Sequence, residues 1–330
     1  MRCPSLDTLP PPPPDRTGWP WTIASAPPPP RRPDGSAWPR VTIVTPSYNQ
    51  GQYLEETIRS VLLQGYPDLE YIIVDGGSTD NSVDIIRKYE PWISWWVTEK
   101  DKGQADAINK GLARSTGEVF QFINSDDLLA QNAVQVVAKS IEGYHAVAGV
   151  VVDFDPDGTR TRLASRNLKP VNFITRPSGY LYHQPGVWLR TEYIRALGGF
   201  NPIYRYKFDW ELQLRYLERW SRVAYIDDTL ALFRLHETSK TTAEGMGFWE
   251  EELVARDLLL HRVVDPDTRA ALKRFVRRRH WRLRVDELVG GLGLSRRRAV
   301  ASLCLEAMRD PLGRIDRYSL GALKRMIAGR

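Results

Sequence analysis

Two adjacent carboxylates, Asp126 and Asp127, follow a short apolar stretch in VFQFINSDDLL, residues 119–129. Carboxylate oxygens are the ligands that Mg²⁺ and Mn²⁺ prefer, and such cations often complete their shell with phosphate oxygens of a substrate. The pair is therefore a candidate metal site. A surface turn or a helix cap uses the same residue types, so position must decide between the two readings.

A third carboxylate, Asp75, ends another apolar stretch and is followed by Gly76 and Gly77. It could accept hydrogen bonds from a ring N–H or a ribose hydroxyl, while the glycines would let a ligand approach the backbone. The alternative is that Asp75 caps the next helix. The segment GGSTD is not a phosphate-binding P-loop, because the lysine of GxxxxGK[ST] is missing.

An alternation of strands and helices that begins at Arg40 is expected to position these acids. Each predicted strand is β-branched or aromatic and is bounded by turn residues. A helix is expected in the segment after the first strand, with apolar residues at helical spacing and Gly65 as its stop, and a second helix is expected to use Ser78 or Thr79 as N-cap. The predicted strands are 41–45, 71–74, 94–98, 119–124 and 146–154. This order predicts an α/β fold with a mainly parallel sheet and helices on both faces.

Polar segments follow the first four predicted strands, namely TPSYN, DGGSTD, EKDKGQ and NSDD. Ligands of parallel α/β sheets collect at the carboxyl ends of the strands, where such loops converge. The four segments are therefore expected to open onto one crevice, which favours the functional reading of the acids.

The segments VTIVTPSYNQGQYLEETIRSVLLQGYPDLEYIIVDGGSTDNS and EKDKGQADAINKGLARSTGEVFQFINSDD resemble the family 2 glycosyltransferases. The resemblance covers roughly residues 40–240. It implies the GT-A fold, a Rossmann-like nucleotide-diphospho-sugar transferase fold, and inverting transfer of a sugar to a hydroxyl of a glycan, glycolipid or similar acceptor. It also implies Mn²⁺ or Mg²⁺ on the diphosphate and a nucleotide-diphosphate sugar donor, most often a UDP-sugar.

The resemblance also assigns residues to the donor site. It implies that Asp75 hydrogen-bonds the nucleotide base, which Pro46, Ser47 and Tyr48 border. The sugar and diphosphate side would be lined by Gln104, Asp106 and Asn109. Further donor-site candidates from the same loops are Asn49, Gly76, Ser78 and Ser125.

In the same resemblance, Asp126 corresponds to the last acid of the D-x-D signature, whose first position holds Asn124 here. Metal ligation must then depend on Asp126, helped by Asp127. His236, in FRLHETSKT, could reach the metal or diphosphate from a closing loop, or it could be structural. Arg234 and Lys240 are candidate phosphate partners, because cations would stabilise the charge of the leaving group.

The acceptor side of the family is resembled by HQPGVWLRTEYIRALGGFNPIYRYKFDWELQLRYLE. Inversion requires a base that removes the proton of the attacking hydroxyl. Asp209 matches the family position of that base, with a helix N-cap as the alternative role and Glu211 as the fallback base. His183 and Gln184 would frame the sugar or acceptor pocket.

The two ends of the chain differ from the predicted catalytic domain. Residues 1–39 contain two proline runs and are expected to be extended or disordered, with Trp19 and Trp21 clamping the segment onto the domain or binding a partner. Residues 241–330 are expected to form a helical, basic extension. Its segment 256–298 has 13 Lys and Arg against 5 Asp and Glu, a net charge of +8 against +6 for the whole chain.

A basic segment with interspersed apolar residues could lie on an anionic membrane surface, or it could pack as a helix with exposed arginines. Nucleic acid is not an expected partner, because the basicity is confined to this extension. Two cysteines, no signal-peptide pattern and no long apolar stretch predict a cytoplasmic protein, with peripheral contact at the inner face of the plasma membrane.

Two other function classes fit parts of the sequence. A sugar-phosphate nucleotidyltransferase shares the α/β sheet and metal acids, but it normally opens with a glycine-rich phosphate loop carrying basic residues, where this chain has TPSYNQGQ. A non-catalytic binding module derived from the same fold is favoured by Asn124 and opposed by the acids at 75, 126 and 209.

Overall fold

The computed structural model describes residues 3–155, 157–158, 160–175, 183–237, 251, 260, 263–289, 296–309 and 317–328. The chain forms two compact units, 1–251 and 252–330. The first unit contains both the proline-rich segment and the sheet, and the boundary falls after Glu251 rather than after residue 240. Lys240 lies outside the described residues.

Nine described strands form one mixed sheet in the first unit, in the order β3-β2-β1-β4-β8-β6-β9-β5, with β7 beside β6. Strands β3, β2, β1 and β4 run parallel, β8 is antiparallel to β4 and to β6, and β6 runs parallel to β9. The strands are β1 Val41–Ser47, β2 Leu69–Asp75, β3 Trp95–Thr98, β4 Val119–Phe122, β5 Leu128–Leu129, β6 Ala146–Phe154, β7 Arg160–Ala164, β8 Val187–Arg190 and β9 Val223–Arg234. The predicted α/β fold with a mainly parallel sheet is confirmed.

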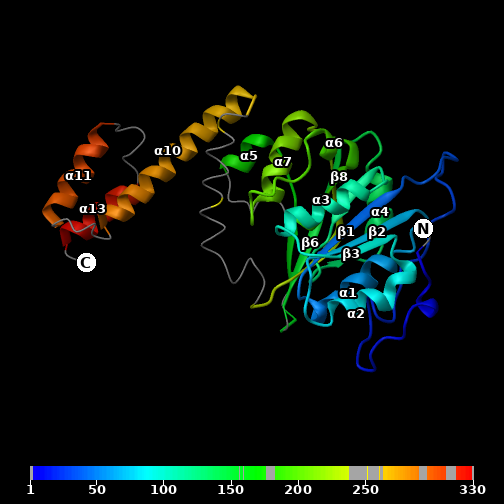
Figure 1. Ribbon diagram of the computed structural model, residues 1–330. Helices are drawn as coiled ribbons and strands as arrows, with labels where there is room; N and C mark the ends of the chain where they lie inside the picture. The colour runs from blue at the N-terminus through cyan, green and yellow to red at the C-terminus, as the bar shows by residue number, and fades with distance from the viewer. Residues whose placement is uncertain are drawn as a thin grey trace. The chain divides into compact units, whose positions relative to one another are not determined.

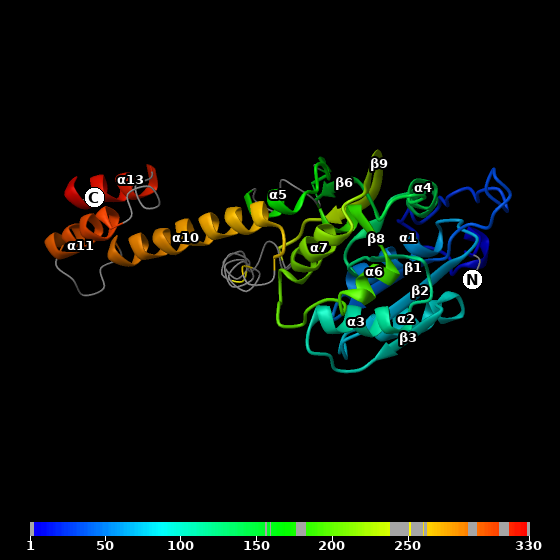
Figure 2. The same cartoon turned by 90° about the horizontal axis from the view of Figure 1, so that it is seen from above.

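Helices cover both faces of the parallel strands, with α1 and α2 on one side and α3 on the other (Figures 1 and 2). Alternation along each strand explains this arrangement. Ile43 and Ile73 belong to the core that packs on α1 and α2, while Val44 faces Gly111 of α3, where a Cβ would lie 2.5 Å from a Val44 methyl. The described α-helices of this unit are α1 Gly51–Leu62, α2 Ser82–Tyr89, α3 Gln104–Arg114, α4 Ala133–Ser140, α5 Pro170–Thr175, α6 Thr191–Ala196 and α7 Phe208–Arg219.

The predicted N-cap of the second helix is wrong. Helix α2 begins at Ser82, and the Asp80 carboxylate accepts the Ser82 N–H at 3.0 Å. Ser78 instead donates its hydroxyl to Asp75 at 2.5 Å. The loop after β2 is therefore longer than predicted, because its polar side chains bond within the loop.

The proline-rich segment contains a short 3-10 helix, Leu6–Thr8, and several turns, and it packs against the rest of the first unit through a buried arginine of α1. Arg59 is 0% exposed, and its guanidinium donates to the carbonyls of Pro10, Pro20 and Trp21 at 2.8 to 3.1 Å. The indoles of Trp19 and Trp21 donate to the Leu129 carbonyl and to the Glu56 carboxylate. Both tryptophans therefore hold the segment on the domain, as the clamp hypothesis predicts.

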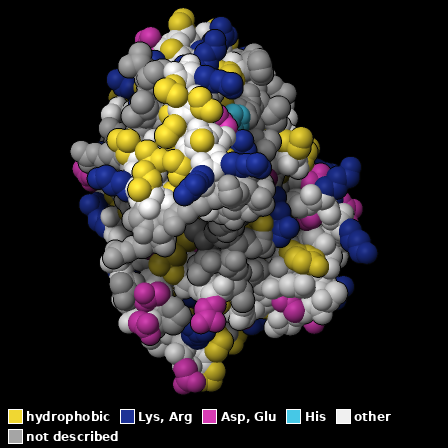
Figure 3. Space-filling view, turned by 90° about the vertical axis from the view of Figure 1, so that its left-hand side faces the viewer, with side chains coloured by type: hydrophobic (Ala, Val, Ile, Leu, Met, Phe, Trp, Pro, Cys, Tyr) yellow, Lys and Arg dark blue, Asp and Glu magenta, His cyan; other side chains and the backbone are white. Residues whose placement is uncertain are grey.

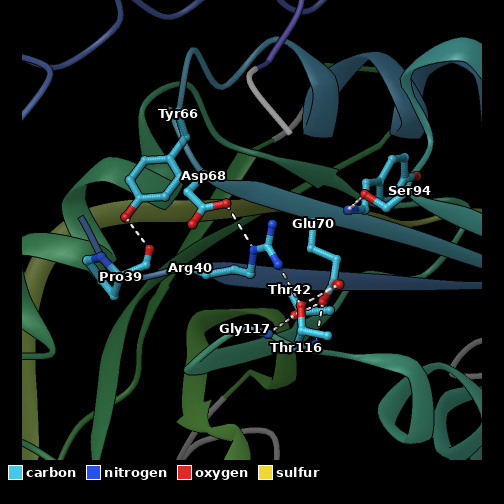
Figure 4. A network of polar contacts seen from close by, with 10 residues as sticks. Pro39, Arg40, Thr42, Tyr66, Asp68, Glu70, Ser94, Thr116 and Gly117 are labelled. Atoms are coloured by element: carbon cyan, nitrogen blue, oxygen red, sulfur yellow. Dashed lines mark hydrogen bonds and ion pairs between the residues drawn. The ribbon is translucent and has the colours of Figure 1, made fainter. Parts of the chain in front are cut away.

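A polar network closes the amino ends of the parallel strands (Figure 4). Glu70 of β2 accepts hydrogen bonds from the Thr42 hydroxyl at 2.6 Å and from the N–H and hydroxyl of Thr116 at 2.6 and 2.7 Å. The Thr42 oxygen also accepts the Gly117 N–H, and Arg40 pairs with Asp68 at 2.9 Å. These groups bond with one another, which ties β1, β2 and the start of β4 together.

The described part of the second unit contains α10 Pro266–Val289, α11 Arg296–Met308 and α13 Arg317–Ala328. The three helices share a small apolar core that includes Trp281, Val285, Leu303 and Met326. Arg284 of α10 pairs with Glu306 of α11 at 3.1 Å. No described helix combines the length and the apolar character needed to cross a membrane.

Candidate active site

The carboxyl ends of the parallel strands surround a cleft of about 830 Å³. Its walls include the ends of β1 and β4, the loops after β2 and β3, the segment before β8 and the segment that leads into α7. The predicted residues that line it are Pro46, Ser47, Tyr48, Gly76, Gln104, Ser125, Asp126, His183, Gln184 and Asp209. The four polar loops therefore converge as the sheet topology predicts.

The β1 end of the cleft offers an aromatic face. The side chain of Tyr48 is 61% exposed, while Ser47 beside it is buried. Asn49 does not line the cleft: its φ is 51°, its side-chain oxygen accepts the Thr79 N–H at 2.8 Å, and its own N–H donates to Ser78. Asn49 thus holds the loops after β1 and β2 together.

Asp75 lies in the interior instead of the cleft. It is 0% exposed, and its two oxygens accept four hydrogen bonds, from the N–H groups of Gly77 and Ser78 and the hydroxyls of Ser78 and Thr98. A carboxylate has about four acceptor positions. Oδ2 accepts three of these bonds and Oδ1 accepts one, from the Ser78 hydroxyl, and the contact of Asp75 with a base stays a prediction.

Only one of the three polar residues predicted on α3 faces the cleft. Gln104 lines it and donates to the Asn124 side chain at 2.6 Å. Asp106 accepts the Lys102 N–H in the first turn of the helix. Asn109 exchanges two hydrogen bonds with the backbone of Phe200, at 2.7 and 2.9 Å, and so joins α3 to the segment before α7.

The turn after β4 separates the two acids of the NSDD motif. Asp126 lines the cleft, whereas Asp127 is 1% exposed and accepts the Arg234 N–H and an Asn124 side-chain N–H. Burial and the neighbouring Asp126 charge raise the pKa of Asp127 well above its usual range. The hydroxyl of Thr57 anchors this turn by donating to the carbonyls of Ser125 and Asp127. Asp127 is thus positioned as a structural residue, and Asn124 supplies the amide that it needs.

His236 is the partner that the structure gives to Asp126. Its Nε2 lies 3.0 Å from Asp126 Oδ2, and its ring packs on Tyr53 with centroids 4.7 Å apart. A carboxylate and an imidazole together form a donor set that suits Mn²⁺. The described residues contain no cluster of three or more His, Cys, Asp or Glu, so a cation here would need further ligands from a substrate or water.

Arg234 supports Asp126 from behind the cleft. Its guanidinium donates to the Asp126 carbonyl at 2.9 Å, pairs with Glu56 at 2.8 Å and lies over the rings of Tyr53 and Phe154. These contacts engage the Arg234 guanidinium, which the sequence analysis predicts as a phosphate partner. Arg234 is therefore placed to position the acid.

Asp209 lines the cleft from the first turn of α7. Glu211, the fallback base, is 1% exposed and forms a two-pronged ion pair with Arg215 at 2.7 and 2.8 Å. The segment that leads into α7 is held by Glu251, whose carboxylate accepts the N–H groups of Arg205, Tyr206 and Lys207. Of the two acids, only Asp209 is placed to reach a molecule in the cleft.

His183 and Gln184 line the cleft from the segment before β8. Gln184 donates to the Gln121 side chain and to the Phe122 carbonyl, both at 3.0 Å. Burial lowers the pKa of His183 to about 4, so the imidazole is neutral at neutral pH. Its Nε2 lies 3.5 Å from Oδ1 of Asp153. Burial raises the pKa of Asp153 to about 6.

Several residues that line the cleft were not selected from the sequence. The loop after β3 contributes Lys100, Asp101 and Lys102, although only Gln104 was selected from that segment. The segment before Asp209 contributes aromatic and basic side chains, and two phenylalanines complete the wall; these are Tyr204, Arg205, Tyr206, Lys207, Phe122 and Phe233. The sequence could have indicated these residues, because aromatic and basic residues alternate in NPIYRYKFD immediately before the predicted base.

Comparison with known families gives a match over residues 42–210 to the model of Glycosyl transferase family 2. A glycosyltransferase of Mycobacterium tuberculosis, Rv1514c, is 36% identical over 105 residues, 32% of this chain and 39% of that protein. TuaG of Bacillus subtilis, named as a putative teichuronic acid biosynthesis glycosyltransferase, is 45% identical over 92 residues, 27% of this chain and 36% of that protein. These matches therefore span about two fifths of the relatives' length.

Solved structures show the same fold at low sequence identity. TarS 1–349 of S. aureus, in complex with UDP-GlcNAc, aligns with a TM-score of 0.58 and 17% identity over 80% of this chain and 79% of that one. A mannosyltransferase of Pyrobaculum calidifontis, in complex with GDP-Man and Mn²⁺, aligns with a TM-score of 0.58 and 18% identity over 94% of this chain and 91% of that one. The GT-A fold expected from the sequence is thereby confirmed.

Proposed function

Because the chain belongs to glycosyltransferase family 2 and is therefore a glycosyltransferase, we propose that it transfers a sugar with inversion from a nucleoside diphosphate donor to an acceptor hydroxyl. One observation carries the proposal: Asp126 and Asp209, which come from different elements, open on the same cleft. In this proposal Asp126 serves the diphosphate side and Asp209 serves the attacking oxygen. Family membership sets aside the nucleotidyltransferase alternative.

Asp209 is the proposed general base. Its carboxylate takes the proton of the acceptor hydroxyl while that oxygen bonds to the anomeric carbon and the bond to the diphosphate breaks. A carboxylate has a reference pKa of about 4 and is ionised at neutral pH, and its fixed position supplies most of the rate benefit. The Glu251 carboxylate accepts backbone N–H groups of the segment before Asp209 and so holds that segment in place.

Asp126 and His236 are the proposed protein ligands of a divalent cation on the diphosphate. The bound cation would neutralise the charge that develops on the leaving group. An imidazole ligand favours Mn²⁺ over Mg²⁺, which prefers oxygen ligands only. Thr57 and Arg234 hold the backbone of the turn that presents Asp126.

We propose a UDP-sugar as donor and a polysaccharide or glycolipid of the bacterial cell envelope as acceptor. Two TarS structures contain UDP-GlcNAc and UDP, respectively, and the Pyrobaculum structure contains GDP-Man. The name of TuaG connects that relative with an envelope polymer. A panel of nucleotide sugars, read out by released nucleoside diphosphate, identifies the donor.

The decisive experiment is donor turnover with and without Mn²⁺ in the wild-type chain and in Asp126→Ala. We expect EDTA and the substitution each to lower turnover by about 100-fold or more, since both remove charge stabilisation of the leaving group. Asp84→Asn, at an exposed position on α2, is the matched control and should behave as wild type. Metal-independent turnover would contradict the metal assignment, and no turnover of any donor would favour the non-catalytic module.

We further propose that the second unit contacts an anionic membrane at the inner face of the plasma membrane. Four apolar side chains on α11 and α13 are exposed: Leu305 (58%), Met308 (64%), Leu320 (49%) and Ile327 (68%). Figure 3, in which these helices face the viewer, shows Lys and Arg side chains beside hydrophobic ones. Apolar insertion and basic charge together favour anionic lipid surfaces.

Vesicle co-sedimentation of the full chain tests the membrane proposal. We expect binding to phosphatidylglycerol vesicles and much weaker binding to phosphatidylcholine vesicles. Replacing the exposed Arg274 and Arg278 by Ala should weaken binding about tenfold or more, since each cation near the surface contributes about 1 kcal/mol. Equal binding of wild type to the two kinds of vesicle would overturn the membrane role. Equal binding by wild type and the arginine variant would overturn it as well.

A further inference from the structure

We infer that the proline-rich segment positions the turn that carries Asp126, through the indole N–H groups of Trp19 and Trp21. The inference rests on the proposed function, in which Asp126 serves the diphosphate side of the cleft, and it adds two positioning residues to that site. Both tryptophans lie outside the wall of the cleft. Each acts through hydrogen bonds that lead to segment 124–129, which follows β4.

The first route to the turn starts at Trp21, which is 5% exposed. Its Nε1 donates to Oε1 of Glu56 at 3.2 Å, and Oε2 of Glu56 accepts a hydrogen bond from Arg234 at 2.8 Å. The Nε of Arg234 donates in turn to the Asp126 carbonyl at 2.9 Å. A guanidinium presents its N–H groups in a fixed planar fork, so the bond to the carboxylate orients the bond to the turn. Trp21 therefore helps to fix the acid that orients Arg234.

The second route starts at Trp19 and holds the chain that follows the turn. Its Nε1 donates to the carbonyl of Leu129 in β5 at 2.9 Å, three residues after Asp126. Ser25 adds a contact in the same part of the chain, because its hydroxyl accepts the Asn132 N–H at 2.9 Å. The proline-rich segment thus holds the turn at Asp126 through the first route and at its carboxyl-terminal end through the second.

Helix α1 joins the proline-rich segment to the turn. Thr57, next to Glu56 in the chain, donates to two carbonyls of the turn at 2.9 and 2.8 Å. Arg59, two residues further on, is 0% exposed, donates to three carbonyls of the segment, and lies over the Trp21 ring at 5.3 Å. Detaching the segment would take these three acceptors away from a buried cation, which is costly. The segment is therefore a lasting part of the support of the site.

The alternative is that the tryptophans only stabilise the fold, as buried aromatic side chains do. Trp38 of the same segment offers a matched control. It is 6% exposed, and its Nε1 donates to the Pro29 carbonyl at 2.8 Å, within the segment. A change to Phe removes one indole N–H and reduces the ring at any of the three positions. Only at Trp19 and Trp21 does the change remove a bond that leads to the turn.

Hydrogen–deuterium exchange of the ligand-free chain and titration calorimetry with UDP and Mn²⁺ test the inference in Trp19→Phe and Trp21→Phe. We expect exchange in segment 124–129 to be about three- to tenfold faster and UDP binding about three- to tenfold weaker in each variant, the effect of one lost hydrogen bond. Trp38→Phe should lower the midpoint of urea unfolding to a similar degree and leave both other quantities at the wild-type value.

A double-mutant cycle tests the first route separately. Because Trp21 acts through Glu56, Trp21→Phe should cause no further loss of UDP affinity in a chain that already carries Glu56→Ala. Glu56→Ala alone should weaken binding more than Trp21→Phe alone, since it removes the partner of Arg234. A further loss in the double variant as large as in the single one would overturn this route.

The outcomes separate the inference from the proposed function. Wild-type exchange and UDP affinity in both Trp19→Phe and Trp21→Phe overturn the inference and leave the proposed function standing. Equal changes in Trp38→Phe overturn it as well, because they would show a general loss of stability. Failure of wild type to bind either UDP or GDP with Mn²⁺ overturns the proposed function together with the inference that rests on it.

Discussion

The two ends of the parallel strands β2, β1 and β4 use their polar residues in different ways. At the amino ends, Glu70 and Thr42 bond with each other and with residues 116–117 (Figure 4). At the carboxyl ends, Asp126 and the other residues that follow the strands open on a cleft of about 830 Å³. The first arrangement satisfies its own hydrogen bonds, and the second leaves acceptors for a ligand.

The difference shows that location at the carboxyl end is not enough to make an acid functional. Asp75 and Asp127 both lie at this end, yet each is buried with its oxygens engaged by the protein. Asp126, which precedes Asp127 in the same turn, and Asp101, in the loop after β3, line the cleft. Neighbouring acids at this end of the sheet therefore differ in whether they build the loop or face the cleft.

Asp209→Asn should produce the largest effect, because it removes the proposed base without removing the side chain's volume. We expect kcat to fall by about 10²- to 10⁴-fold. The affinity for the donor nucleotide and the midpoint of urea unfolding should stay close to wild type. Steady-state kinetics and calorimetry on the same preparation measure both quantities. Wild-type turnover by this variant would remove Asp209 from the mechanism.

Asp75→Ala should affect stability as well as binding, although the residue lies at the functional end of the sheet. The substitution leaves four donors of the β2 and β3 loops without their acceptor, and we expect the free energy of unfolding to fall by about 3 kcal/mol. Urea denaturation measures this loss. An unchanged midpoint together with lost nucleotide binding would show instead that Asp75 acts directly on the ligand.

Glu70→Gln should have the smallest effect and should leave kcat unchanged. We expect a loss of about 1 to 2 kcal/mol in the free energy of unfolding at pH 7, reduced because Glu70 is partly exposed to solvent. A change in kcat larger than the change in folded fraction would contradict the purely structural role of the residues at the amino ends of the strands.

The loss in Glu70→Gln should also depend on pH. Burial works to raise the pKa of Glu70, but hydrogen bonds from the Thr116 N–H and from the hydroxyls of Thr42 and Thr116 outweigh it and hold the pKa below its usual range. The stabilisation is therefore present above the unfolded-state pKa of about 4.3 and is lost as the pH falls through the folded-state value. The free energies of unfolding of wild type and Glu70→Gln should converge at low pH. A difference between them that grows on acidification would contradict this assignment.

The sequence was sufficient to predict the fold and the convergence of the loops, because alternating strands and helices determine a parallel sheet and hence its binding edge. It was not sufficient to separate ligand-facing residues from structural ones. That separation depends on distant partners: Asn109 bonds to Phe200 and Arg234 pairs with Glu56. Asp101, which lines the cleft, was not selected from the sequence because its proximity to Gly76 arises only when the loops after β2 and β3 come together in the fold.

Hydrogen–deuterium exchange with and without UDP and Mn²⁺ tests the contrast between the two ends most directly. The account predicts slower exchange on ligand addition in segments 47–50, 76–78, 100–105 and 124–127. It predicts no change in 66–70 and 116–119, which already bond internally. Protection confined to the amino-end segments, or its absence from the segments of the cleft, would contradict the account.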